Sequence, residues 1–142
     1  MKNKITVYPL HVLNQLAANT LLEVLDIKIT AIEEDYIEGT MPVDKRTHQV
    51  FGILHGGASV ALAETLGSLG ASLTVDPAKF RCVGLDINAN HLKAVKTGLV
   101  TGTARPIHTG RSTQVWQIEI KNDAGEMVCI SRLTMAVVPI EK

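Results

Sequence analysis

Residues 48–75 read HQVFGILHGGASVALAETLGSLGASLTV, and this run decides the fold prediction. The pair Gly56-Gly57 opens a helical pattern of about fourteen residues, which Gly70 closes. Glu64 is the only Asp, Glu, Lys or Arg in the whole run. Because a helix that is apolar nearly all round is normally buried, this helix is predicted to form the core of the protein. A carboxylate buried there is costly unless it is satisfied or has a function.

The segments on both sides of this helix alternate between apolar and polar residues, with the period of two that is typical of strands. Strands are expected at 27–31, 37–41, 83–87, 99–103 and 116–120, and at the nearly continuously apolar segment 127–138. Within 83–87 the alternating apolar positions are Val83, Leu85 and Ile87. Residues 122–125, Asn-Asp-Ala-Gly, indicate a hairpin turn. A shorter helix is expected within residues 11–24, where Leu13, Leu16, Ala17 and Leu21 have helical spacing.

Together these elements predict the fold class. The connections between the later strands are of hairpin length, too short for helical crossovers, so the sheet is predicted to be antiparallel. One mostly apolar helix beside five or six strands indicates an α+β domain whose sheet wraps around the helix. No repeat, low-complexity tract or linker divides the sequence, so residues 1–142 are predicted to form a single domain.

Composition and charge exclude several classes of function. Fourteen basic and fourteen acidic residues give a formal net charge of zero, so no global field favours binding to nucleic acid or to an acidic membrane. The two cysteines have no metal-site spacing and are too few for a disulfide scaffold, and no histidine lies in an HExxH pattern. We therefore predict no metal, no nucleic-acid partner and a reduced, cytoplasmic setting.

The apolar segment 50–75 is long enough to raise the question of a transmembrane helix. It contains five glycines, His55 and Glu64, and a carboxylate is costly at the centre of a bilayer. The start, MKNKITVYPL, has too short an apolar stretch for a signal peptide, and no small-residue cleavage site follows it. Neither membrane insertion nor export is expected.

Three segments resemble a known family. FGILHGGASVALAETLGS, with MPVDKRTHQ before it and VGLDINANHLK after it, is similar to the hotdog-fold acyl-CoA thioesterases. Within that family the likeness is to the branch that contains the 1,4-dihydroxy-2-naphthoyl-CoA hydrolases and the phenylacetate-pathway thioesterases. It extends from about Asp26 to Val138, and its most specific part is the HGG-x6-E helix start. The resemblance implies the hotdog fold, hydrolysis of an (aryl) acyl-CoA thioester, and no cofactor, since coenzyme A is part of the substrate.

The resemblance also implies the catalytic residues. Glu64 is implied to act as nucleophile or general base, and the Gly56 N–H to polarise the thioester carbonyl. The residues implied to lie nearby are Gln49, His55 and Ser68. Chemistry supports these roles, because hydrolysis builds negative charge on the carbonyl oxygen, which helix N-terminal N–H groups stabilise. A carboxylate either attacks the thioester carbon or deprotonates a water, and both routes remain open, as does a simple capping role for His55.

The same resemblance implies that coenzyme A lies along three segments. They are Val83, then Asn90, His91, Leu92 and Lys93, and then Ile107, His108, Thr109, Gly110, Arg111 and Ser112. Lys93 stands where several relatives have arginine, and a lysine cannot make the bidentate phosphate contact of an arginine. The sequence HTGRS at 108–112 also fits an ordinary loop before a strand.

Two other functions remain open at this point. One is a hotdog acyl-thioester hydratase or dehydratase, although the DxNPxH-type signature is absent. The other is a non-catalytic acyl-CoA-binding module, which has no need of Glu64. The sequence fixes neither the acyl group nor the choice between coenzyme A and an acyl carrier protein.

Helix geometry predicts an active site that two subunits share. Gly56 and Glu64 are eight residues apart in sequence, which is about 12 Å along a helix axis. A reacting carbonyl must lie roughly 3 to 3.5 Å from its attacking atom and about 3 Å from its oxyanion donor. One helix does not easily supply both groups, so they are expected to come from two subunits. The resemblance likewise implies a homodimer or a dimer of dimers with shared active sites.

Overall fold

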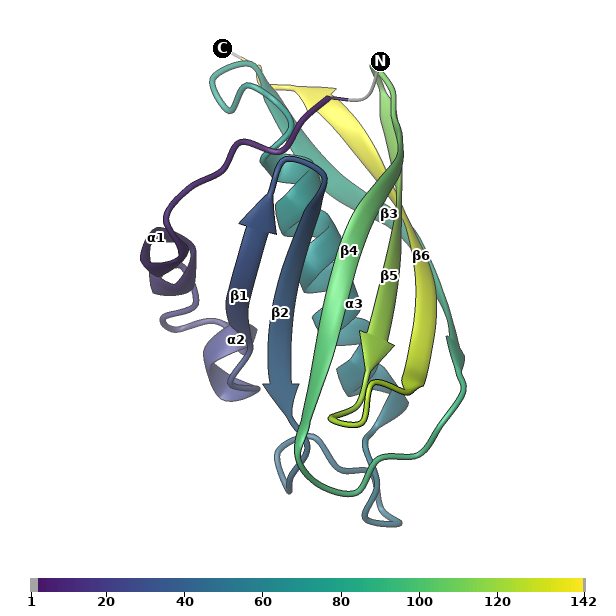
Figure 1. Ribbon diagram of the computed structural model, residues 1–142. Helices are drawn as coiled ribbons and strands as arrows, with labels where there is room; N and C mark the ends of the chain where they lie inside the picture. Colours follow the sequence, from purple (N-terminus) through teal and green to yellow (C-terminus); the bar gives the residue numbers. More distant parts are fainter. Residues whose placement is uncertain (1–2, 142) are drawn as a thin grey trace.

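The computed structural model describes residues 3–141 as one sheet and three helices (Figure 1). The helices are α1 (Leu10–Gln15), α2 (Leu21–Val24) and α3 (Gly56–Ser72). The strands are β1 (Lys28–Glu33), β2 (Tyr36–Pro42), β3 (Phe80–His91), β4 (Leu99–Thr109), β5 (Thr113–Lys121) and β6 (Met127–Pro139). The α+β class, the strands and the single long helix agree with the prediction from the sequence.

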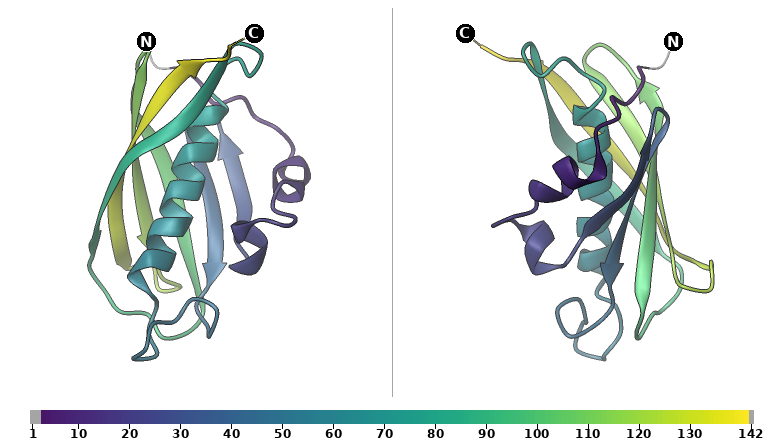
Figure 2. Two further views of the ribbon diagram at one scale, coloured as in Figure 1. Left: turned by 180° about the vertical axis from the view of Figure 1, so that it is seen from behind. Right: turned by 60° about the vertical axis from the view of Figure 1, so that its left-hand side comes forward.

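The six strands form one antiparallel sheet in the order β1-β2-β4-β5-β6-β3. The sheet curls around α3, which lies along its concave face (Figure 2). The short helices α1 and α2 lie beyond β1, at the edge opposite to β3 (Figure 1). This arrangement is the hotdog fold that the resemblance implied.

Small residues on α3 let the helix approach the sheet closely. A Cβ added to Gly67 would lie 2.7 Å from Cδ2 of Leu133, and one added to Gly70 would lie 2.8 Å from the ring of Trp116. Both partners are fully buried. A larger residue at either position would push the helix away from the sheet, so this packing fixes the height of Glu64 above the strands.

The apolar run 50–75 forms a loop, then α3, then the residues that follow the helix. The helix has 17 residues and buries one side against the sheet. Among residues 3–141, no helix is both long enough and apolar enough to cross a bilayer.

The segment 11–24, predicted as one helix, forms two short helices. The first ends at Gln15, and the second begins after Thr20, whose hydroxyl accepts a hydrogen bond from the Leu22 N–H. Asn19 between them has a φ of 62°, in the left-handed region that asparagine tolerates but a right-handed helix does not contain. Both short helices thus use part of the predicted helical spacing, but Asn19 prevents a continuous helix between them and Thr20 caps the second one.

A bulge in β3 changes which of its residues face α3. The pairing of β3 with β6 shifts by one residue between Gly84 and Asp86, so Leu85 is the extra residue. Before the bulge, the inward-facing positions are even-numbered: Cys82 is half-buried, and its Sγ donates to a carbonyl of α3. After the bulge they are odd-numbered, because Ile87 packs against the core.

The strict alternation predicted for Val83, Leu85 and Ile87 therefore fails in this strand. Val83 is 40% exposed and Leu85 is 61% exposed, whereas Ile87 is partly buried. A one-residue insertion moves every later side chain to the other face of a strand. Val83 before the bulge and Leu85 within it are thus exposed, whereas Ile87 after it packs against the core.

The outer edge of β3 pairs with no other strand in the described chain. β3 is the last strand of the sheet and is 12 residues long. A long exposed edge with apolar side chains is a template for pairing with another chain. This edge is therefore the part of the sheet best suited to pair with a further strand.

Candidate active site

Glu64 lies at the middle of α3 and points at the edge strand β3. Its Oε2 lies against Gly84, where an added Cβ would be 2.8 Å away. The side chain is half-buried, and within residues 3–141 its carboxylate makes no hydrogen bond or ion pair with a protein group. A half-buried carboxylate without a structural partner is available for chemistry.

A cavity of about 640 Å³ opens beside Glu64, between α3 and the two N-terminal helices. Its wall is mostly apolar and carries a few hydroxyl groups. The lining residues are Leu13, Leu16, Leu21, Leu22, Gly57, Val60, Ala61, Glu64, Thr65, Ser68, Leu69 and Ser72. The structure thus brings Ser68 and Glu64 to one cavity. Its mostly apolar wall suits a ligand with an apolar body and one reactive group beside Glu64.

The first amides of α3 are satisfied by its cap, with one exception. The Gly57 N–H donates to Nδ1 of His55 at 2.8 Å, and the N–H groups of Ala58 and Ser59 donate to the His55 carbonyl at 3.0 and 3.2 Å. The N–H of Gly56 donates to no group in the described part of the chain. It is therefore a free donor at the positive end of a long helix, where a developing oxyanion would be stabilised.

His55 is the N-cap of α3, which is the structural role that the sequence left open. The bond from Gly57 uses the lone pair of Nδ1, so the neutral ring carries its proton on Nε2. The backbone N–H of His55 donates to the Thr47 carbonyl at 2.8 Å. These bonds fix the ring at the start of the helix, and its role in catalysis stays a prediction.

A second cavity, of about 400 Å³, lies at the start of α3. Its lining residues are Gln49, Ile53, Leu54, Gly56, Ser59, His91, Leu92, Lys93, Ala94 and Val128. The His91 ring lies against Gly56, since an added Cβ there would be 3.0 Å from Nε2. The side-chain oxygen of Gln49 accepts a hydrogen bond from the Phe51 N–H. Gln49, Gly56 and His91 therefore meet here from a loop, a helix start and a strand end.

A tight turn at the end of β2 holds the loop that leads into α3. The Arg46 guanidinium pairs with Asp44 at 2.6 Å, and its hydrogen bond lowers the pKa of that carboxyl to about 2. Thr47 is 1% exposed, and its hydroxyl donates to the Pro42 carbonyl at 2.9 Å. Because the Thr47 carbonyl accepts the His55 N–H, this turn connects the end of the strand directly to the helix cap.

A single chain leaves Glu64 and Gly56 in different cavities. Glu64 lines the larger cavity and Gly56 the smaller one. Eight residues of helix separate them by about 12 Å along its axis. Within one chain these two groups therefore lie too far apart to contact the same thioester carbonyl.

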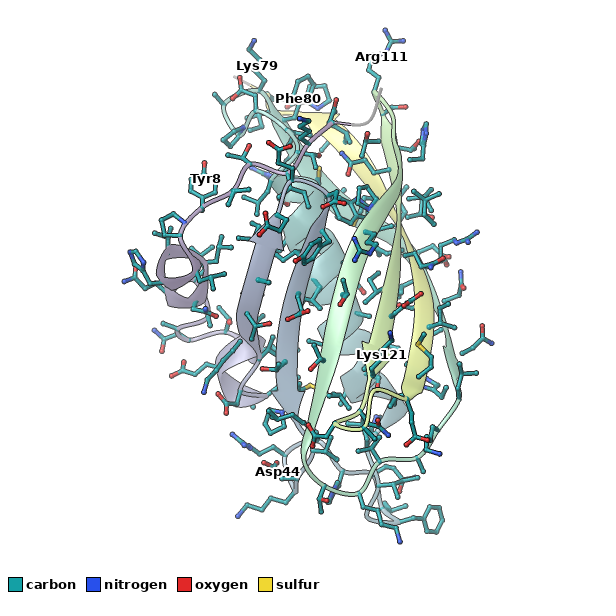
Figure 3. All side chains as sticks on the ribbon, viewed as in Figure 1. Tyr8, Asp44, Lys79, Phe80, Arg111 and Lys121 are labelled. Carbon is teal, nitrogen blue, oxygen red and sulfur yellow. The ribbon has the colours of Figure 1, made fainter. Side chains whose placement is uncertain are left out.

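The residues predicted to bind coenzyme A fall into two groups. Asn90, His91, Leu92 and Lys93 lie at the end of β3, beside the second cavity. Val83 and residues 107–112 lie toward the other end of the sheet. Arg111 projects from the top of the molecule, far above Lys121 in its lower half (Figure 3).

Strand register gives the separation of the two groups. Val83 and Thr113 pair with the same residue of β6, and His91 and Ile120 pair with another residue of that strand. Ile120 is seven residues after Thr113 along β5, which corresponds to about 23 Å at 3.3 Å per residue. Within one chain the structure does not bring the groups together.

Lys93 is engaged in an ion pair at the surface. Its Nζ lies 3.1 Å from Oε2 of Glu126, and both side chains are about half exposed. A hydrogen bond from Asn122 and then the bond from Lys93 lower the pKa of Glu126. Exposed pairs of this kind are weak, so Lys93 can exchange Glu126 for a phosphate at little cost.

Two residues that shape the site were not identified from the sequence. Gly84 stands in a predicted strand, where an isolated glycine indicates a bulge or a close approach, so a signal was present. Thr47 gave no local signal, because its role depends on hydrogen bonds to residues that only the fold brings near.

The side chains that could bind a metal ion are not grouped in the described part of the chain. Within residues 3–141, no three His, Cys, Asp or Glu side chains are grouped so that they could hold a metal ion. Cys82 and Cys129 are free thiols, and burial raises the pKa of both. A raised pKa makes a thiol a poor nucleophile at neutral pH.

Comparisons with known proteins show which family this chain belongs to. The family model described as the thioesterase superfamily matches residues 51–129. The 1,4-dihydroxy-2-naphthoyl-CoA hydrolase of Escherichia coli is 47% identical over 136 residues, 96% of this chain and 97% of the relative. The proofreading thioesterase EntH of Cronobacter turicensis is 49% identical over 128 residues, 90% of this chain and 93% of the relative. The crystal structure of a thioesterase from Haemophilus influenzae superposes with a TM-score of 0.94 at 51% identity, covering 99% of this chain and 97% of that one.

Proposed function

This chain belongs to the thioesterase superfamily and is a thioester hydrolase, and on this premise we propose that it hydrolyses an aryl acyl-CoA thioester to the free acid and coenzyme A. The observation that carries the proposal is the unpaired carboxylate of Glu64 in a leucine-lined cavity. The flat, apolar acyl group would occupy that cavity. The name of the 1,4-dihydroxy-2-naphthoyl-CoA hydrolase supports an aryl group, since that relative is 47% identical.

Glu64 supplies the reactive oxygen by one of two routes. As a nucleophile, its carboxylate attacks the thioester carbon, the thiolate of coenzyme A leaves, and water then hydrolyses the resulting anhydride. As a general base, it takes a proton from a water that attacks the same carbon. Both routes need a carboxylate that is free of a structural ion pair, as Glu64 is among the described residues. Ser68, on the same cavity wall, is placed to hold the water or the carboxylate.

The start of α3 supplies the electrophilic half of the site. The free N–H of Gly56 donates to the thioester oxygen as it becomes negative, and the helix dipole adds to the stabilisation. Gln49 and His55 orient the group that reacts there. No cofactor takes part, because the fixed dipole and one carboxylate suffice for this reaction class.

The complete site forms between two chains. Antiparallel pairing of β3 with the β3 of a second copy would continue the sheet across a two-fold axis. The two α3 helices would then lie side by side and antiparallel on the same face of the joint sheet. Each Gly56 would approach the middle of the other helix, where Glu64 lies. A homodimer, or a dimer of such dimers, therefore completes the site that one chain leaves open.

The same pairing unites the two groups of predicted coenzyme A residues. The two-fold axis places the His91 end of one β3 beside the Phe80 end of the other, because antiparallel strands run in opposite directions. Lys93 of one chain then approaches the level of Val83 and Arg111 in the other. These cations would hold the nucleotide phosphates at the surface while the thioester enters the interface.

Release of free thiol from benzoyl-CoA tests the proposed function. A hydrolase frees coenzyme A, which a thiol reagent detects, whereas a hydratase or dehydratase frees none and a binding module shows no turnover. A panel of aryl and aliphatic acyl-CoA esters then tests the acyl class, and we expect the aryl esters to give the highest kcat/KM. Preference for aliphatic esters would overturn the aryl assignment and leave the hydrolase assignment intact.

A further inference from the structure

We propose that Gly84, together with the bulge after it, forms the seat that positions the Glu64 carboxylate, which makes Gly84 a positioning residue for hydrolysis. The inference rests on the proposed function, in which Glu64 attacks the thioester or activates water. It adds a contribution from the edge strand to the catalytic groups on α3 and the loop before it.

Gly84 leaves a notch in β3 that the carboxylate occupies. An added Cβ would lie 2.8 Å from Oε2 of Glu64, whereas Sδ of Met135 would be 3.9 Å away. A methyl group would therefore displace the carboxylate and nothing else. The φ of Gly84 lies outside the left-handed region, so the backbone itself does not require glycine. The remaining reason for a glycine at this position is the space that the Glu64 carboxylate occupies.

The bulge at Leu85 lets one strand contact both the middle and the start of α3. Before it, Gly84 faces inward onto Glu64, and after it, His91 faces inward onto Gly56. If the same residues, Leu85 included, alternated strictly without a bulge, polar residues would face the helix, namely Asp86, Asn88 and Asn90. The bulge thus permits both contacts at once, which accords with the frequent occurrence of bulges next to active sites.

The contact with Gly84 determines where the Glu64 carboxylate lies, because no polar contact holds that group among residues 3–141. Glu64 makes no hydrogen bond or ion pair there, so van der Waals contact with the strand limits its rotamers. A misplacement of about 1 Å in a catalytic group can cost about 10²-fold in rate. Filling the notch should therefore reduce turnover while leaving the acyl cavity, and hence substrate binding, unchanged.

Gly84→Ala tests the seat directly. We expect kcat with benzoyl-CoA to fall at least about tenfold and KM to change less than about threefold, since the added methyl acts on the attacking group alone. Because the methyl meets only the end of a flexible side chain, the melting temperature should stay close to that of the wild type. Glu33→Ala, an exposed position on β1 at the opposite edge of the sheet, is the control and should retain activity.

A double-mutant cycle with Glu64→Asp separates positioning from a general effect on the strand. Aspartate is one methylene shorter, so its carboxylate no longer fills the notch, and Gly84→Ala should cost little more in that background. Losses that multiply, or a Gly84→Ala variant with more than half of the wild-type kcat, would overturn the inference. Glu64→Gln distinguishes this failure from failure of the proposed function: if that variant is inactive while Gly84→Ala is fully active, only the seat is wrong.

Discussion

The N–H of Gly57 donates to Nδ1 of His55 at 2.8 Å, which leaves the N–H of Gly56 as the free donor at the start of α3 within the described chain. Gly56 is the first residue of the helix, a position that suits proline. His55 before it has a φ of −67° and a ψ of 130°, a conformation that a residue preceding proline readily adopts. Substitution at Gly56 can therefore remove the donor without breaking the helix.

Gly56→Pro is expected to lower kcat by about 10²- to 10³-fold, the usual cost of losing one oxyanion donor. Gly56→Ala is the matched control, because it places the same Cβ 3.0 Å from the His91 ring but keeps the N–H. Thiol release from benzoyl-CoA measures both variants. Equal kcat values for the two would show that the amide does not contribute to catalysis.

Glu64→Gln should keep the fold and lower kcat by about 10²-fold or more, because the amide has nearly the same shape but neither attacks nor accepts a proton well. The melting temperature should change little, since the carboxylate has no structural partner among residues 3–141. Retention of more than about a tenth of the wild-type kcat would be incompatible with an essential role.

Arg111→Ala should raise KM for an acyl-CoA by about five- to tenfold with kcat largely unchanged, as expected when an exposed charge-assisted contact far from the reacting atoms is lost. A thioester of pantetheine, which lacks the nucleotide, should show no such change. Lys28→Ala, on the opposite edge strand, is the control for loss of a surface cation. An equal effect on the two thioesters would remove Arg111 from the nucleotide site.

Asp44→Asn should change the acid sensitivity of the protein. The pKa of Asp44 is lowered from 3.8 to about 2 in the folded state, so its ion pair with Arg46 stabilises the fold above the unfolded-state value. That contribution is lost as the pH falls from about 4 toward 2. The difference in urea midpoint between wild type and variant should therefore be largest at pH 7 and shrink below pH 4. A difference that grows on acidification would contradict this linkage.

The fold was predictable because its two strongest signals are local. The apolar run around α3 and the period-two segments around it each report a burial pattern that the chain must satisfy. The bulge at Leu85 was not predictable in the same way, because a five-residue alternation does not reveal a single inserted residue. The break at Asn19 was likewise hidden, since the leucines on both sides keep helical spacing across it.

The site residues also differ in this respect: a local sequence pattern reveals some of them, and only the folded chain reveals the others. Glu64 and Gly56 stood out because one is the lone charge in an apolar run and the other opens a helix. The contacts of Gly84 with Glu64 and of His91 with Gly56 join residues that only the sheet brings together. Similarly, the sequence does not show that Lys93 and Arg111 lie toward opposite ends of the sheet, because their positions follow from strand register.

The shared-site dimer leads to a complementation experiment. Glu64→Ala lacks the carboxylate, and Gly56→Pro lacks the oxyanion donor, so each variant alone should be nearly inactive. In a mixed dimer, the intact Gly56 of one chain faces the intact Glu64 of the other, and the second site carries both defects. Unfolding the two variants together and refolding them should therefore restore activity.

The expected yield follows from the two-fold symmetry. Under random pairing about half of the dimers are mixed, and each has one intact site of two, so recovery should approach roughly a quarter of the wild-type activity. Each variant refolded alone is the control, and subunit exchange is verified with an affinity tag on one variant. If both variants are dimeric and exchange subunits but recover no activity, each chain holds its own site and the shared-site arrangement is wrong.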